Sequence, residues 1–149
     1  MASEFHYQRR VEFADTDRAG IVHFARYLCY AEEAEHAFLR SLGLSVHVPA
    51  DGHSVGFPRR AVRVEYRRPI RFEDLVDVHI WVHRKGARSL TYHYRMTHDG
   101  ETVAVGEVVA VCVRFCGEGV AEAVPLPERF STRIDEAPYP ALEFREASR

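Results

Sequence analysis

The chain has 149 residues and a net charge of −2, with 46% hydrophobic and 28% charged residues. This length suits one domain that buries a core without disulfides or metals. The charge argues against a dedicated nucleic-acid binder, and no apolar run reaches the ~18 residues that a membrane span needs. The polar N-terminus and the odd count of 3 cysteines favour a reducing cytoplasm over secretion.

The first element predicted along the chain is a strand. Residues 5–13 alternate between apolar and polar side chains, which is typical of a half-buried strand. Its apolar face is expected to hold Phe5, Tyr7, Val11 and Phe13. A loop rich in turn-forming residues follows over residues 14–20.

A long helix comes next. Residues 23–42 carry apolar side chains at spacings of one, three and four, which predicts one long amphipathic helix. Gly43 stands where a glycine commonly ends a helix. Residues 44–58 contain several prolines and glycines and are typical of a loop.

The second half of the chain predicts four further strands, joined by short turns. Alternating apolar residues place them at about residues 62–67, 76–82, 90–96 and 102–115. The Asp99-Gly100 pair is a hairpin signal, and Gly106 is interpreted as a β-bulge. The tail holds one short predicted helix near residues 127–134.

This order of elements predicts an α+β fold, with one long helix against a mostly antiparallel five-stranded sheet. We expect a single domain over residues 1–149, with its core at about residues 5–115 and a C-terminal tail at residues 117–149. One helix covers only one face of such a sheet. A second subunit is therefore expected on the other face or at an edge, which predicts a homo-oligomer.

The loop before the helix carries the residues of chemical interest. Asp15 and Asp17 lie two apart, and Gly20 allows close approach of the backbone. In a structural interpretation, the aspartates form Asx turns or cap the helix. In a functional interpretation, a carboxylate stands beside the free N–H groups of a helix N-terminus, which hold an oxyanion in acyl transfer.

The motif Asp15-Thr16-Asp17-x-x-Gly20, followed by His23, Tyr27 and the pair Glu32-Glu33, resembles the signature of hot-dog-fold acyl-CoA thioesterases. The similar subfamily is the 4-hydroxybenzoyl-CoA thioesterase type. The resemblance implies a helix wrapped by the sheet and hydrolysis of an acyl- or aroyl-CoA to the free acid and CoA. It also implies a dimer or tetramer with its sites at a subunit interface.

Position by position, the resemblance makes Asp17 the catalytic carboxylate, either as nucleophile or as the base that activates water. A backbone N–H at His23 or Phe24 would polarise the thioester carbonyl. The resemblance implies contacts with the substrate for the following residues of the loop and helix. These are Gly20 and Ile21 at the turn, Tyr27 in the pocket wall, and His23 and Glu32, each of which faces either the pocket or solvent.

Coenzyme A carries several phosphate charges, so basic residues are expected at the entrance of the site. The resemblance points to the hairpin that contains Arg84, Lys85, Arg88 and Ser89. Arg59 and Arg60 form a second candidate cluster; the alternative is that these are ordinary surface arginines. No metal or cofactor is implied, since coenzyme A is part of the substrate.

Three alternatives stand beside the thioesterase interpretation. A hot-dog enoyl-CoA hydratase or dehydratase would use Asp17 and His23 as acid and base, but the spacing between them differs from the hydratase pattern. A hot-dog domain that only binds acyl-CoA has no need of a carboxylate at Asp17. A metal enzyme built on Asp15, Asp17 and His23 lacks a clear ligand cluster.

Overall fold

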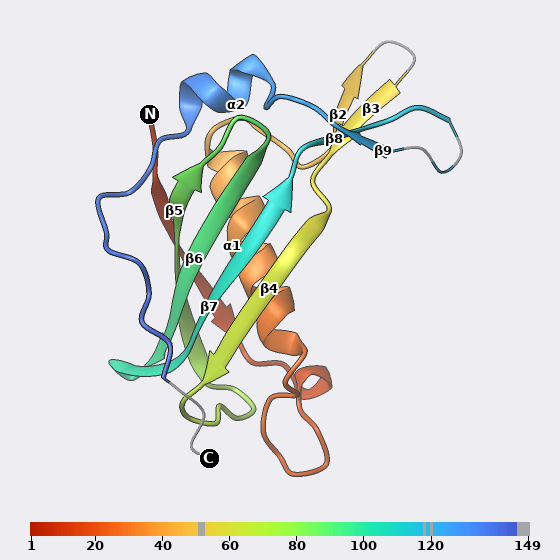
Figure 1. The fold of residues 1–149 in the computed structure, drawn as a ribbon. Helices are drawn as coiled ribbons and strands as arrows, with labels where there is room; N and C mark the ends of the chain where they lie inside the picture. Colours follow the sequence, from red (N-terminus) through yellow and green to blue (C-terminus); the bar gives the residue numbers. More distant parts are fainter. Residues whose placement is uncertain (51–52, 118, 120, 146–149) are drawn as a thin grey trace.

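A five-stranded antiparallel sheet curls around one long helix in the computed structural model (Figure 1). The structure describes residues 1–50, 53–117, 119 and 121–145. The helix is α1 (Arg26–Ser41). The strands run in the order β1 (Glu4–Arg10), β5 (Leu75–Lys85), β6 (Ser89–His98), β7 (Glu101–Val111) and β4 (Arg59–Tyr66). This architecture confirms the predicted α+β class.

The core lies between α1 and the inner face of the sheet. The helix buries Tyr27, Tyr30, Ala31, Ala34 and Phe38, which recur every three or four residues on one face. The two alanines let the helix backbone approach the strands closely, while the aromatic rings fill the space beside them. The helix ends as predicted, with Gly43 at a φ of +69°.

Two boundaries at the N-terminal side differ from the prediction. The first strand ends at Arg10, and the chain turns into a 3-10 turn, η1 (Phe13–Asp15). Phe13 is 77% exposed, so its predicted place on the buried face is wrong, because the alternation stops before it. The helix begins three residues later than expected, because His23 is held by the hydrogen bond of its N–H to the carbonyl of Asp15, and a turn closed by the N–H of Arg26 on the carbonyl of His23 precedes the helix.

A second, four-stranded sheet was not predicted. Its strands run in the order β2 (Val48–Ala50), β3 (His53–Gly56), β8 (Val113–Phe115) and β9 (Ala121–Ala123). Strands this short leave too few residues for an alternating pattern. The strand predicted at residues 102–115 is in fact β7 and β8, separated at Cys112, whose N–H donates to the carbonyl of Arg88.

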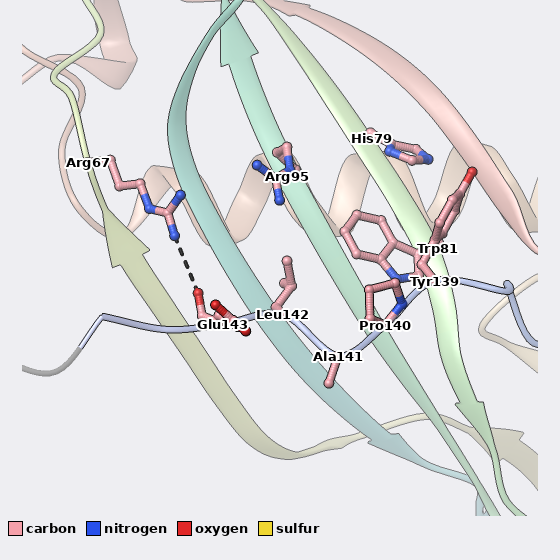
Figure 2. A pocket seen from close by; sticks show the side chains of 9 residues that line it. All are labelled: Arg67, His79, Trp81, Arg95, Tyr139, Pro140, Ala141, Leu142 and Glu143. Atoms are coloured by element: carbon pink, nitrogen blue, oxygen red, sulfur yellow. Dashed lines mark hydrogen bonds between the residues drawn. The ribbon is translucent and has the colours of Figure 1, made fainter.

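The outer face of the sheet is crossed by residues 135–145, which we call the C-terminal strap (Figure 2). It follows the predicted short helix, observed as α2 (Glu128–Arg133). One end is held where the N–H of Ala137 donates to the carbonyl of Val82. The other end is held where the N–H of Arg145 donates to Glu65 Oε2 at 2.6 Å. No helix within the described ranges is long and apolar enough to span a membrane.

Gly106 has a different role from the predicted bulge. The pairing of β7 with β6 and β4 is regular at this residue, and the register shifts lie elsewhere, between Arg59 and Ala61 and between Met96 and Thr97. A Cβ atom at Gly106 would overlap the ring of Tyr94 and lie 2.7 Å from the carbonyl oxygen of Arg63. The glycine is therefore required because the Tyr94 ring packs directly on the backbone of β7.

Substitution Gly106→Ala tests this packing. We expect a loss of about 1–3 kcal/mol in the free energy of unfolding, measured in urea, because the added methyl group overpacks the sheet. The same substitution in a Tyr94→Leu background is expected to cost less, since the ring that it strikes is gone. Equal costs in the two backgrounds would contradict this explanation.

Candidate active site

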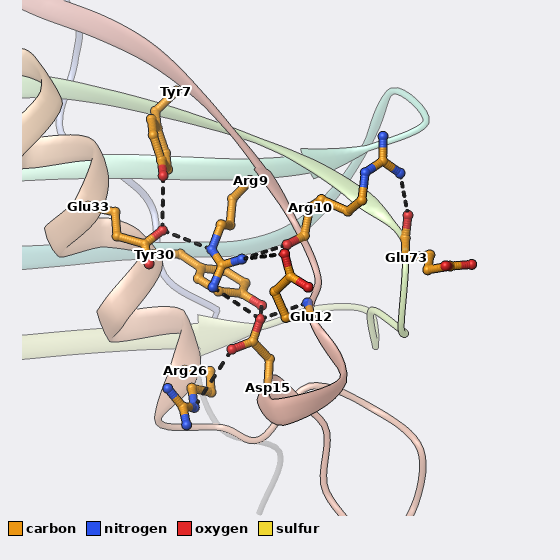
Figure 3. A network of polar contacts seen from close by, with 9 residues as sticks. All are labelled: Tyr7, Arg9, Arg10, Glu12, Asp15, Arg26, Tyr30, Glu33 and Glu73. Atoms are coloured by element: carbon orange, nitrogen blue, oxygen red, sulfur yellow. Dashed lines mark hydrogen bonds and ion pairs between the residues drawn. The ribbon is translucent and has the colours of Figure 1, made fainter.

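The carboxylate of Asp15 is buried at the end of η1 and is only 2% exposed. Its Oδ2 accepts a hydrogen bond from the hydroxyl of Tyr30 at 2.7 Å and one from the backbone N–H of Glu12 at 2.9 Å. The guanidinium of Arg9 lies 3.3 Å from the same oxygen (Figure 3). Asp15 therefore acts as a structural residue that joins β1, η1 and α1.

Arg9 extends this network onto the helix. It belongs to the half-buried face of β1, and its Nε donates to Glu33 Oε2 at 2.9 Å. The hydroxyl of Tyr7 donates to the same oxygen at 3.2 Å. Burial and the hydrogen bond to Asp15 raise the pKa of Tyr30 far above its usual range, so its hydroxyl stays protonated and remains a donor.

The loop after Asp15 closes on itself. The carbonyl of Asp15 accepts the N–H of His23 at 2.8 Å, and the N–H of Asp17 donates to the carbonyl of Ile21 at 2.8 Å. Gly20 completes the turn with a φ of +80°, a conformation that favours glycine. The buried network at Asp15 thus fixes both ends of the loop that carries Asp17.

Asp17 differs from Asp15 in its surroundings. It is exposed, and its Oδ1 accepts the N–H of Ala19 at 2.8 Å in an Asx turn. In the part of the chain that the structure describes, Oδ2 of Asp17 has no hydrogen-bond donor or cationic partner. One carboxylate oxygen is thus used to orient the side chain, while the other remains open to a substrate.

Asp17 lines a cavity of about 460 Å³ at the N-terminal end of α1. The other lining residues are mostly aromatic or apolar, with two arginines: Ile21, Val22, Phe24, Tyr27, Tyr66, Arg67, Arg68 and Pro69. The Tyr66 hydroxyl donates to the carbonyl of Phe24 at 2.7 Å, and its ring meets the Tyr27 ring edge-on. These contacts hold the backbone of Phe24 at the cavity.

Of the two backbone N–H groups predicted to polarise a carbonyl, only the one at Phe24 is free. The N–H of His23 is taken by the carbonyl of Asp15, so that half of the prediction is corrected. No acceptor for the Phe24 N–H lies among the described residues. The N-cap residue is Ala25, whose methyl group cannot accept a hydrogen bond. The first turn of α1 also has no acidic residue. No side-chain hydrogen bond therefore caps the start of α1, whose positive dipole end lies at the cavity that Asp17 lines.

Three other predicted residues lie at or near this cavity. Ile21 and Tyr27 line it, and Gly20 lies in the turn beside them. The side chain of His23 is exposed and stacks on Phe24, with the ring centroids 4.5 Å apart. Glu32 lies elsewhere, with its side chain 59% exposed and 3.9 Å from Arg59.

The predicted coenzyme A contacts are not brought to Asp17 within one chain. Arg10 pairs with Leu75 and Glu4 with Trp81, so the hairpin after β5 lies at the far end of the sheet from the Asp17 loop (Figure 1). This hairpin carries Arg84, Lys85, Arg88 and Ser89.

Two of the predicted basic residues have structural partners. Lys85 Nζ donates to the carbonyls of Ser131 and Ile134. Arg59 pairs with the buried Glu35 at 2.7 Å, and the neighbouring Arg60 is exposed. Roles in coenzyme A binding for all these residues stay predictions.

Several residues of the site were not predicted from the sequence. Arg9 follows Tyr7 at a spacing of two, which is the one signal that it shares the inward face of β1. Tyr66 and Arg68 gave no signal, because their distance from Asp17 in the sequence hides their contact through the fold. No cluster of three or more potential metal ligands occurs among the residues described.

The comparisons with known proteins agree on one family. A family model described as the thioesterase-like superfamily matches residues 11–134. The chain is 29% identical over 128 residues to the 1,4-dihydroxy-2-naphthoyl-CoA hydrolase of Synechococcus elongatus, covering 85% of this chain and 92% of the relative. It is 30% identical over 110 residues to the acyl-CoA thioester hydrolase YbgC of Escherichia coli, covering 73% and 81%.

A solved structure shows the same fold. The 1,4-dihydroxy-2-naphthoyl-CoA thioesterase from Synechocystis superposes with a TM-score of 0.76 at 24% identity, covering 87% of this chain and 94% of that chain. This likeness confirms the predicted hot-dog fold, and the family match confirms the resemblance found in the motif.

The role assigned to Asp15 is tested by Asp15→Asn. Removing the charge leaves Arg9 without its buried partner, so we expect the free energy of unfolding to fall by about 3 kcal/mol, measured by chemical denaturation. Asp99→Asn is the matched control, because Asp99 is exposed on a hairpin; we expect a change within about 0.5 kcal/mol. If Asp15→Asn were as stable as the wild type, the buried network would not hold the loop.

Proposed function

This chain belongs to the thioesterase-like superfamily, and on that premise we propose that it hydrolyses the thioester of an acyl- or aroyl-CoA. The products are the free acid and coenzyme A. The observation that carries the proposal is the cavity that Asp17 and Phe24 both line, where a carboxylate oxygen and a backbone N–H have no partner within the described part of the chain. A thioester needs a nucleophile at its carbonyl carbon and a donor at its carbonyl oxygen.

In the proposed reaction, the thioester carbonyl oxygen accepts the N–H of Phe24 at the start of α1. Asp17 then acts in one of two ways. Its carboxylate attacks the carbonyl carbon, the C–S bond breaks, and water hydrolyses the resulting anhydride. Alternatively, Asp17 takes a proton from water, and the hydroxide attacks directly. In both routes the thiolate of coenzyme A leaves and takes up a proton.

The cavity wall suggests the kind of acyl group. Phe24, Tyr27 and Tyr66 offer aromatic surface, which suits an aromatic or apolar acyl group. The Synechococcus relative is named for an aromatic acyl group, which supports an aroyl-CoA. The YbgC relative is named for acyl-CoA in general. Arg68 pairs with Glu101 at 3.3 Å, but both side chains are more than 60% exposed, so Arg68 can exchange this partner for the phosphates of coenzyme A.

We also propose that the active protein is a homo-oligomer, either a dimer or a tetramer. The strand β4 is at the edge of the main sheet, and no described residue pairs with its outer side. Leu28, Val62 and Tyr66 are exposed on α1 and β4, and Tyr66 also lines the Asp17 cavity. An unpaired edge with apolar neighbours is typical of a surface that another chain covers. A cytoplasmic location remains a prediction from the cysteine content.

The activity is tested by measuring release of free thiol from a panel of acyl-CoAs, including short, medium and long aliphatic chains, benzoyl-CoA and phenylacetyl-CoA. We expect Asp17→Asn to lose at least about 100-fold of the rate on the best substrate, because it removes the charge and keeps the size. Asp135→Asn, on the C-terminal strap, is the control and keeps the wild-type rate.

Other results would contradict the proposal. Undiminished thiol release by a folded Asp17→Asn variant would remove Asp17 from the reaction. If the wild type binds acyl-CoA and releases no thiol, an assay of enoyl-CoA absorbance separates the remaining alternatives. Loss of that absorbance would indicate a hydratase, whereas no change would indicate a domain that only binds acyl-CoA.

The oligomer is tested by sedimentation equilibrium at micromolar concentration. We expect a mass of at least twice the 17.1 kDa of the chain. Val62→Arg places a charge on the exposed side of β4 and is expected to shift the protein toward the monomer. A wild-type mass of 17.1 kDa at that concentration would contradict the proposal.

A further inference from the structure

A second cavity lies on the outer face of the sheet, beneath the C-terminal strap. It has a volume of about 550 Å³, which is within the range of small-molecule sites. The strands contribute Arg67, His79, Trp81 and Arg95, and the strap contributes residues 139–143. Figure 2 shows Arg95 between Arg67 on one side and Trp81 on the other, with the strap passing across them. The Asp17 site uses neither Trp81 nor Arg95.

The strap arches over this cavity because it is held only toward its two ends. At one end the N–H of Ala137 donates to the carbonyl of Val82, and the ring of Tyr139 meets the rings of His79 and Trp81 edge-on. At the other end, the ring of Phe144 stacks on the guanidinium of Arg63. Between them, Pro140, Ala141 and Leu142 make no hydrogen bond to any described residue. The middle of the roof therefore packs on the sheet by side chains, and at Glu143 the backbone carbonyl accepts a hydrogen bond from Arg67 Nη2 at 3.4 Å (Figure 2).

Two polar groups in the cavity, on Arg95 and Trp81, have no anionic partner among the described residues, whereas His79 lies 3.6 Å from Glu4. Arg95 is half-buried, and its Nη1 donates only to Thr102 Oγ1 at 3.4 Å. No carboxylate in the described part of the chain lies within ion-pair distance of it, and Glu143 on the strap makes no ion pair with either arginine. Trp81 is 5% exposed, and its buried indole N–H meets no acceptor among the residues that the structure describes. By contrast, Arg67 is neutralised by Glu65 at 2.9 Å.

The apolar part of the cavity lies beside Arg95. Trp81 and Tyr139 meet edge-on, with ring centroids 5.6 Å apart, and Leu142 faces the sheet from the strap. A guanidinium without a carboxylate favours an anion with two parallel oxygens. An aromatic wall favours a flat, apolar body. Inorganic sulfate or phosphate would satisfy the first requirement and leave the second unused.

We propose that this cavity is a second ligand site, which binds a small aromatic carboxylate through Arg95 and the ring of Trp81. The carboxylate accepts two N–H groups of Arg95, and the ring packs against Trp81 and beneath Leu142. This site is on the opposite face of the sheet from α1. Arg67 lines both cavities, but the proposed thioester hydrolysis uses neither Arg95 nor Trp81, so binding here does not depend on that reaction.

The chain has 1 tryptophan, so the intrinsic fluorescence of the intact protein reports directly on this cavity. Titration with benzoate is expected to change the Trp81 emission in a saturable way. Arg95→Gln is expected to weaken binding by about tenfold or more, because the charged hydrogen bonds are lost. Arg84→Gln, an exposed arginine at the far end of β5, is the control. Asp17→Asn is expected to bind benzoate as the wild type does, whatever its hydrolytic rate.

Leu142→Glu is a second variant that does not depend on the folding of Arg95→Gln. It places a carboxylate on the exposed strap above Arg95 and is expected to abolish benzoate binding. No saturable change with the wild type would overturn the proposal, as would unchanged affinity in folded Arg95→Gln. Equal binding of uncharged benzyl alcohol would remove the role of the guanidinium. Displacement of benzoate by equimolar sulfate would show a general anion site instead.

Discussion

The structure around the candidate site depends on the buried carboxylate of Asp15. Burying a charge is costly unless it is paired and hydrogen-bonded. Asp15 accepts hydrogen bonds from the Tyr30 hydroxyl and the N–H of Glu12, and it pairs with Arg9. These partners come from the helix, the first strand and the intervening turn. Their contacts fix the loop, whose far end is held by the bond from the N–H of His23 to the carbonyl of Asp15. The position of Asp17 follows from that closure.

Two aspartates that are neighbours in the motif therefore have different functions, because their surroundings differ. Asp15 is enclosed, and its Oδ2 accepts two hydrogen bonds and faces Arg9, whereas Asp17 is exposed and has one oxygen with no partner among the described residues. The same closure uses the N–H of His23 and leaves the N–H of Phe24 available at the uncapped start of α1. A loop of this kind presents one carboxylate and one backbone donor to a single cavity.

Much of the fold was predictable, since the helix and the five main strands have long periodic patterns. The small second sheet was not, because its strands have three or four residues each. Within the site, Asp17, Ile21, Phe24 and Tyr27 are local to the motif and were found there. Tyr66, at the end of β4, and Arg68, just after it, are brought to the Asp17 cavity by the pairing of β4 with β7. No local sequence pattern predicts such a contact. The N–H of His23 is already hydrogen-bonded to the carbonyl of Asp15, and this bond could be seen only in the structure.

A crystal structure of Asp17→Asn with an uncleaved acyl-CoA such as benzoyl-CoA tests the central claim most directly. We expect the thioester carbonyl oxygen to lie about 3 Å from the Phe24 N–H, with the side chain of residue 17 beside the carbonyl carbon. The acyl group would lie against Tyr27 and Tyr66. A thioester bound away from the N-terminus of α1, with Phe24 N–H and residue 17 both facing solvent, would contradict it.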